Sequence, residues 1–281
     1  EYLESTEAMT SDYDENVVKP DGAKKAIVEK LKQKYHREIF EETGVEYKIE
    51  VALLKDVATL TIDTSGMGLH KRGYRLEANG APIKETLAAS LCCLSRLRPY
   101  HTLYDPMCGS GTILIEGAML VNNIAPGLHR HFTAERWESI PESVWNEERE
   151  RAKSLELADS QFVAYGSDID SRSLEVAMTN AKRAGVDKHI IFEKADVRNF
   201  APKSEKGTVI CNPPYGERLL ELKDAEEIYK SMGKVFRQER GWAYNIISPS
   251  EDFEVFFGRK ADKRRKLYNG MIKCQLYMYF K

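Results

Sequence analysis

Segments with strand patterns alternate with helical segments through the middle of the chain, and this alternation limits the fold more than any other feature. Strands are predicted at residues 100–104, 161–167, 189–193, 207–211 and 242–248, and helices at 82–97, 112–122, 171–184 and 224–238. Strands connected through helices form a parallel sheet that is covered on both faces. We therefore expect an α/β fold with a doubly wound, mostly parallel sheet.

The C-terminal segment departs from this pattern. Asn269-Gly270 separates two strand-like runs, and this dipeptide is the strongest short hairpin signal. The last strand, which runs through Tyr279-Phe280, is therefore expected to be antiparallel to its neighbour.

The N-terminal 65 residues predict a small α+β module. Residues 1–20 are acidic and polar and are expected to be loop, while residues 23–35 have apolar positions on one helix face. Two strand patterns, at 47–53 and 57–62, flank a turn at Lys55-Asp56. One helix and two strands are too little to fold alone, so residues 66–281 are expected to form the main domain.

Two further segments connect or interrupt these parts. Residues 66–75 contain three glycines and several basic groups, which predicts a linker with a basic face. Pro82 is expected at the first position of the following helix, where its missing N–H costs nothing. Residues 123–160 interrupt the alternation with two tryptophans and a charged helix around 147–157, and such an insertion often shapes substrate binding.

Composition excludes several classes of protein. The five cysteines form no CxxC pair, so neither a disulfide framework nor a zinc cluster is expected. No apolar run reaches the ~18 residues of a membrane span, and the acidic N-terminus is unlike a signal peptide. We expect a cytoplasmic protein with reduced thiols and no metal. The net charge of −2 is mild evidence against nucleic-acid binding but leaves room for local basic patches.

A glycine-rich turn lies between the predicted strand at 100–104 and the following helix. Its residues are Asp105, Pro106, Met107, Cys108, Gly109, Ser110, Gly111 and Thr112. The two glycines permit close approach of a ligand to the backbone, and the helix N-terminus supplies free N–H donors. The spacing matches neither a Walker A loop nor a dinucleotide fingerprint. A purely structural glycine turn is the alternative interpretation.

Acidic residues follow the next two predicted strands. Asp168, beside Ile169, stands where a carboxylate can accept both hydroxyl groups of a ribose. Asp170 is better explained as the N-cap of the helix that begins at Ser171. Asp196-Val197 follows the strand at 189–193, but Asp is common in turns and this signal is weak alone.

Asn212-Pro213-Pro214-Tyr215 follows the apolar strand at 207–211. The prolines fix the backbone and remove two N–H donors, which presents the Asn212 amide oxygen beside a peptide carbonyl. Two acceptors in this arrangement suit the two N–H bonds of an aromatic amine, and the Tyr215 ring offers a surface for an unstacked base. A rigid turn is the alternative. Cys108 and Cys211 lie near this site but have no partner base, so we interpret them as small core residues.

In this order, the four motifs resemble class I amino-methyltransferases, and the chain is most similar to RNA guanine-N2 methyltransferases that carry a THUMP domain. The bacterial 23S rRNA enzymes of that group resemble it most. The resemblance covers roughly residues 45–281 and includes the segments 72–75, 82–90, 124–127 and 212–218. It implies a seven-stranded sheet with an antiparallel last strand. Residues 1–65 would then hold only part of a THUMP module.

The resemblance also implies a cofactor, S-adenosylmethionine, and roles for the motifs. Asp105 to Thr112 would contact the cofactor, as would Asn212; Asp168-Ile169 would lie at its ribose, and Asp196-Val197 near its adenine. Asn212 to Tyr215 would hold the target base. The expected partner is RNA, most readily ribosomal RNA, contacted by basic side chains. These are Lys71, Arg72, Arg75, Arg130, Lys263, Arg264 and Arg265.

Two other functions remain open on the sequence alone. An adenine-N6 methyltransferase acting on RNA or DNA is one, because Asn-Pro-Pro-Tyr suits either amine. A non-catalytic RNA-binding assembly protein with the same fold is the other, although the intact motif at 212–215 argues against it.

Overall fold

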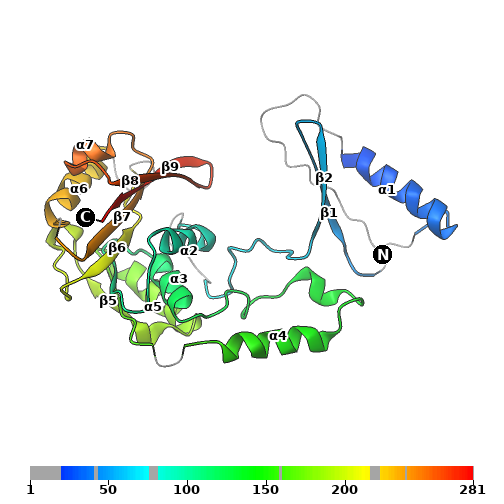
Figure 1. Cartoon of the computed structure of the whole chain (residues 1–281), viewed down its shortest axis with the longest axis horizontal. Coiled ribbons are helices and arrows are strands. Elements are labelled where there is room, and N and C mark those ends of the chain that lie inside the picture. The colour runs from blue at the N-terminus through cyan, green and yellow to red at the C-terminus, as the bar shows by residue number, and fades with distance from the viewer. Residues whose placement is uncertain are drawn as a thin grey trace. The chain divides into compact units, whose positions relative to one another are not determined.

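The computed structural model describes residues 20–40, 44–75, 82–157, 160–215, 222–237 and 239–280. Most of the loop predicted at residues 1–20, namely residues 1–19, lies outside these ranges, as do residues 216–218 of the last motif segment. Pro20 is the first residue of a helix. The chain divides into two compact units, residues 1–69 with 131–148 and residues 70–130 with 149–281 (Figure 1). None of the helices in the described ranges has the length and apolar character needed to cross a membrane.

The larger unit is built on a seven-stranded sheet in the order β5-β4-β3-β6-β7-β9-β8. The strands are β3 (Leu103–Asp105), β4 (Ala164–Asp168), β5 (Ile190–Lys194), β6 (Gly207–Cys211), β7 (Trp242–Ser248), β8 (Lys263–Asn269) and β9 (Ile272–Tyr279). Strands β3 to β7 pair in parallel, whereas β9 is antiparallel to both β7 and β8. The predicted sheet, with its antiparallel last strand, is confirmed.

The β8–β9 hairpin turns one residue later than the dipeptide suggested. Asn269 pairs with Ile272, so Gly270 and Met271 are the two turn residues. Gly270 has a φ of +63°, a left-handed conformation that glycine adopts without a steric cost.

Helices cover both faces of the sheet, as the alternation predicted. They are α2 (Glu85–Leu94), α3 (Thr112–Val121), α5 (Ser171–Arg183), α6 (Leu222–Val235) and α7 (Phe253–Phe257). Helix α4 (Glu142–Ser154) lies in the predicted insertion and has no buried residue. Short 3-10 helices are η1 (Thr133–Arg136), η2 (Asp187–His189) and η3 (Val197–Asn199). Helices α2, α3 and α5 supply one apolar cluster, and α6 and α7 supply the other.

Successive strand residues enter opposite clusters, which is the period of two that a half-buried strand requires. Leu103 belongs to the cluster with α3, and its neighbour Tyr104 to the cluster with α6. Ile210 and Val209 of β6 divide in the same way. Central strands that are buried on both faces explain the continuous apolar runs in the sequence.

The start of α2 differs from the prediction. The helix begins at Glu85 instead of Pro82, and Lys84 has an extended backbone. Arg75 Nη2 donates to the Ile83 carbonyl at 3.0 Å, so that carbonyl serves a side chain and not the helix. A hydrogen bond from Arg75, eight residues earlier in the chain, therefore overrides the local preference of proline for a first helical turn.

The smaller unit contains α1 (Pro20–Tyr35), β1 (Lys48–Leu54) and β2 (Val57–Asp63). The predicted hairpin is confirmed: β1 and β2 are antiparallel, and both Lys55 and Asp56 have positive φ, as a two-residue turn requires. Trp137 stacks on Tyr47 at 4.8 Å between ring centroids and donates to the Glu46 carbonyl. Residues 131–148 of the predicted insertion thus group with this unit, and the first segment of the unit ends at residue 69.

Candidate active site

All four motifs follow the carboxyl ends of parallel strands, and three of them lie where the strand order reverses. The order descends from β5 to β3 and then continues with β6 and β7. Asp105, Asp168 and Asn212 end or follow β3, β4 and β6, which are neighbours in the sheet. Ligands of doubly wound folds bind at this reversal, so the topology assembles residues that are far apart in sequence.

The glycine-rich loop after β3 is fastened to the end of β4. Cys108 N donates to the Ser167 carbonyl at 3.0 Å, and Gly109 N donates to Asp168 Oδ2 at 2.9 Å. Gly109 has a φ of +51°, and its Cβ position faces open space. Gly111 has a φ of +77°, and a Cβ there would lie 3.0 Å from Ala177 Cβ. The loop therefore needs glycine at 111 for packing against α5.

Asp105 lies beneath this loop, with 2% of its surface exposed. Its Oδ1 accepts from Met107 N at 3.2 Å. Burial, with a further contribution from the charge of Asp168, raises the pKa of Asp105 to about 8. Asp105 thus supports the loop from below through this hydrogen bond, and its contact with a cofactor stays a prediction.

The end of β4 presents a carboxylate beside an exposed apolar residue. Asp168 accepts from Gly109 N and, at 3.0 Å, from Asp170 N. The neighbouring Ile169 is 64% exposed. Asp170 accepts from the backbone N–H groups of Arg172 and Ser173, which confirms its predicted role as the N-cap of α5.

Asp196 caps the 3-10 helix η3 by accepting from Arg198 N at 2.8 Å, and it also pairs with the Arg198 guanidinium at 2.9 Å. Val197 is 4% exposed and belongs to the cluster with α6. Its side chain therefore packs in the core, and a contact of this residue with a cofactor, which stays a prediction, would have to use its backbone.

The Asn-Pro-Pro-Tyr segment after β6 is held by hydrogen bonds from two tyrosines. Tyr215 Oη donates to Asn212 Oδ1 at 2.5 Å, and Tyr229 Oη donates to the Pro214 carbonyl at 3.2 Å. Asn269 Nδ2 donates to Tyr215 Oη at 3.4 Å. The Tyr215 ring packs against the apolar core, and burial raises the pKa of its hydroxyl. In this structure the ring is folded back on Asn212 and is not an open platform.

The basic side chains predicted to contact RNA fall into two groups. Arg72, Arg75 and Arg130 are engaged within the domain, and Arg130 is only 4% exposed. The sequence predicted that these three side chains lie on the surface, whereas the structure shows them largely buried. Lys71, Lys263, Arg264 and Arg265 are exposed. Arg264 differs from the others because its guanidinium pairs with Glu254.

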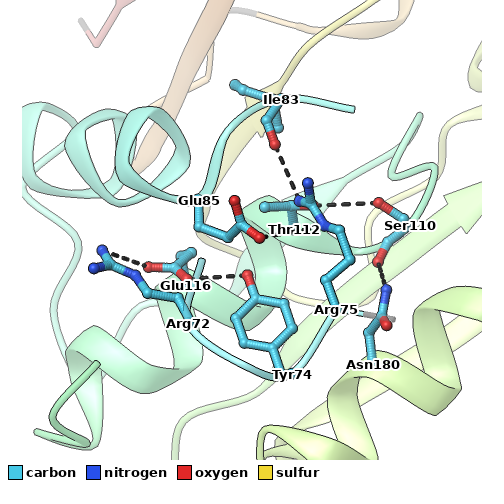
Figure 2. Close-up of polar contacts among 9 residues, drawn as sticks. All are labelled: Arg72, Tyr74, Arg75, Ile83, Glu85, Ser110, Thr112, Glu116 and Asn180. Atoms are coloured by element: carbon cyan, nitrogen blue, oxygen red, sulfur yellow. Dashed lines mark hydrogen bonds and ion pairs between the residues drawn. The ribbon is translucent and has the colours of Figure 1, made fainter. Parts of the chain in front are cut away.

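Sequence inspection missed the acidic partners of these arginines. Arg72 pairs with Glu116 at 3.6 Å, and Tyr74 Oη donates to the same carboxylate at 3.0 Å (Figure 2). Arg75 pairs with Glu85 at 3.4 Å. The sequence did contain a signal for Glu116, which is the one charged residue in the apolar run of α3. A carboxylate buried there needs a basic or hydrogen-bonding partner, so a partner could have been expected.

All five cysteines are free thiols, and Cys108 and Cys211 are buried. Burial raises the pKa of both thiols well above its usual value, which agrees with their interpretation as small core residues. Within the described ranges, His, Cys, Asp and Glu side chains form no group of three or more that is suited to hold a metal ion.

The chain is similar to known methyltransferases. A family model described as the RMKL-like methyltransferase domain matches residues 72–278. YpsC of Bacillus subtilis (strain 168), named as a candidate RNA methyltransferase, is 48% identical over 92% of this chain and 67% of its own length. Ribosomal RNA large subunit methyltransferase K/L of Shewanella baltica (strain OS195) is 38% identical over 91% of this chain.

That alignment spans only 37% of the Shewanella protein, so this chain corresponds to about a third of it. Among solved structures, SMU.472, a candidate methyltransferase complexed with SAH, superposes with a TM-score of 0.88 at 40% identity. The superposition covers 99% of this chain and 74% of that one.

Proposed function

Because this chain belongs to the RMKL-like methyltransferase family, we propose that it transfers a methyl group from S-adenosylmethionine to the exocyclic N2 amine of a guanine in large-subunit ribosomal RNA. The Bacillus and Shewanella relatives, named for RNA and ribosomal RNA, support the substrate class. The observation that carries the proposal is that Asp168 ends β4 and Asn212 directly follows β6, the two strands that flank β3 at the sheet reversal.

The residues at this edge fit the methyl donor. Asp168 uses one acceptor site of each carboxylate oxygen for the backbone, so both oxygens retain a lone pair for a ribose diol. The exposed Ile169 suits the apolar face of an adenine, and open space at Gly109 lets a ligand approach the loop backbone. Bound S-adenosylmethionine supplies an electrophilic methyl group on a sulfonium.

Asn212 is the residue that would bind the target amine. Its Oδ1 accepts from the Tyr215 hydroxyl, which sets the orientation of the amide and leaves a second lone pair. A hydrogen bond from the base amine to this oxygen, and one to the Pro213 carbonyl, would favour a pyramidal, nucleophilic nitrogen. Both bonds strengthen as positive charge develops on the amine, so they act most in the transition state.

Strand β8 would carry the RNA backbone away from this site. Its last residue, Asn269, contacts Tyr215, and Lys263 to Lys266 are exposed along the same strand. At about 3.3 Å per residue, Arg265 lies roughly 13 Å from Asn269, and Lys263 shares its face because side chains alternate. Exposed cations at this distance suit phosphates that flank a base held at Asn212.

The RNA surface is tested by measuring affinity for unmodified ribosomal RNA as a function of salt. Lys263→Gln and Arg265→Gln should each weaken binding and reduce the salt slope by about one. Arg264→Gln is the matched control from the same strand, and its effect should be smaller because Glu254 already neutralises Arg264. Equal effects at all three positions would contradict this surface.

The modified nucleoside distinguishes the two amines. Digestion of RNA methylated by the protein should release N2-methylguanosine. Release of N6-methyladenosine instead would replace the proposal by an adenine-N6 methyltransferase that uses the same Asn212 chemistry.

A further inference from the structure

Arg75 joins three segments beside the glycine-rich loop. Its Nη2 donates to the Ile83 carbonyl at 3.0 Å and to Thr112 Oγ1 at 2.5 Å, and its Nε pairs with Glu85 at 3.4 Å (Figure 2). Thr112 is the first residue of α3, and its hydroxyl lies 3.2 Å from Ser110 Oγ. One guanidinium thus fixes two hydroxyl groups at the N-terminal turn of α3.

The charge of Arg75 is balanced by Glu85. This favours a role in holding neighbouring groups in place over direct binding of an anion. The Arg75 and Glu85 side chains are 15% and 4% exposed. Nη2 of the planar guanidinium donates to Ile83 and Thr112 while Nε, a second nitrogen of the same rigid fork, faces Glu85. The single nitrogen of an ammonium group cannot occupy both positions. Arg75 therefore controls where the Ser110 and Thr112 hydroxyls lie.

The strand order indicates which part of the methyl donor lies nearest to these hydroxyls. The sulfonium sulfur of S-adenosylmethionine is bonded to three groups, which are the adenosine, the methyl group and the amino-acid chain. With the adenosine at Asp168, at the end of β4, and the methyl group at Asn212, just after β6, as proposed above, the sulfur would lie over the loop that follows β3, the strand between them. The amino acid then extends toward the remaining side of that loop, where α3 begins with free N–H donors.

We propose that Arg75 is a positioning residue for the amino-acid end of the methyl donor, acting through Thr112 and Ser110. This inference rests on the proposed function, since it requires the donor to bind at the loop. It assigns a role to a residue whose place in the basic linker at first suggested RNA contact.

Isothermal titration calorimetry on the whole chain tests it with two ligands. S-adenosylhomocysteine contains the amino acid, whereas 5′-methylthioadenosine keeps the adenosine and the thioether but lacks it. Arg75→Lys should weaken binding of S-adenosylhomocysteine roughly tenfold, the effect of one lost charge-assisted hydrogen bond, and change 5′-methylthioadenosine affinity less than about twofold. Thr112→Val removes the acceptor while retaining Arg75 and Glu85, and it should show the same selective loss.

Arg72→Lys is the matched control. Arg72 lies on the same segment and pairs with a carboxylate of α3, Glu116, farther along the helix than Thr112. Its replacement should leave the ratio of the two affinities at the wild-type value. An equal loss for both ligands in Arg75→Lys, or no loss for either, would overturn the inference while wild-type binding upholds the donor site. Failure of the wild-type chain to bind either ligand would overturn the proposed function as well.

Discussion

Asp105→Asn is expected to change how the stability of the protein depends on pH. Asp105 is buried, and its pKa in the folded state is about 8, against 3.8 for the free side chain. Its folded pKa is raised, so the folded state binds the proton more tightly, and this stabilisation is lost as pH rises toward 8. Asparagine preserves the acceptor for Met107 N and has no proton to lose.

The magnitude follows from the two pKa values. Between pH 5.5 and 7.5, Asp105 should lower the free energy of unfolding of the wild type, relative to Asp105→Asn, by roughly 2–3 kcal/mol. Urea unfolding of both proteins, followed by far-UV circular dichroism at the two pH values, measures this difference because all other titrating groups cancel. A constant difference between the proteins, or one that grows in favour of the wild type with pH, would refute protonation of Asp105 in the folded state.

Three further substitutions test the loop, the buried charges and the Asn212 site. Gly111→Ala should destabilise the protein by about 2–4 kcal/mol in thermal unfolding, because residue 111 is left-handed and its new Cβ would crowd Ala177; a wild-type melting temperature would contradict the packing. Glu116→Ala should cost about 3–5 kcal/mol by leaving Arg72 buried beside an empty position, and unchanged denaturant midpoints would disprove that pair. Tyr215→Phe should lower kcat with little change in donor affinity, because the Asn212 amide loses the hydroxyl that orients it. Full activity of this variant would show that the Tyr215 hydroxyl is dispensable.

Much of the fold was predictable because it depends on local patterns. The apolar runs of β6 and β7 matched their observed limits, Lys55-Asp56 formed the expected turn, and Asp170 became a helix cap. Each of these depends on residues within a few positions of one another. The order of motifs along the chain also located the carboxyl edge of the sheet, because parallel strands place their ends together.

The contacts that shape the site were not predictable for the opposite reason. Arg75 meets Thr112 across 37 positions, and Asn269 meets Tyr215 across 54. Basic residues in a glycine-rich linker suggested solvent exposure. Only the folded chain shows that Arg72 pairs with Glu116 and Arg75 with Glu85. A further contact of Arg75, with the Ile83 carbonyl, accompanies the start of α2 at Glu85 instead of Pro82.

The most direct test of the central claim is transfer of a labelled methyl group from S-adenosylmethionine to unmodified large-subunit ribosomal RNA, with Asn212→Ala alongside. The account predicts label in RNA as N2-methylguanosine with the wild type. It predicts loss of that label with Asn212→Ala, while calorimetry shows that S-adenosylhomocysteine still binds the variant. Undiminished transfer by Asn212→Ala, or a wild type that binds the donor but labels no RNA, would contradict the account.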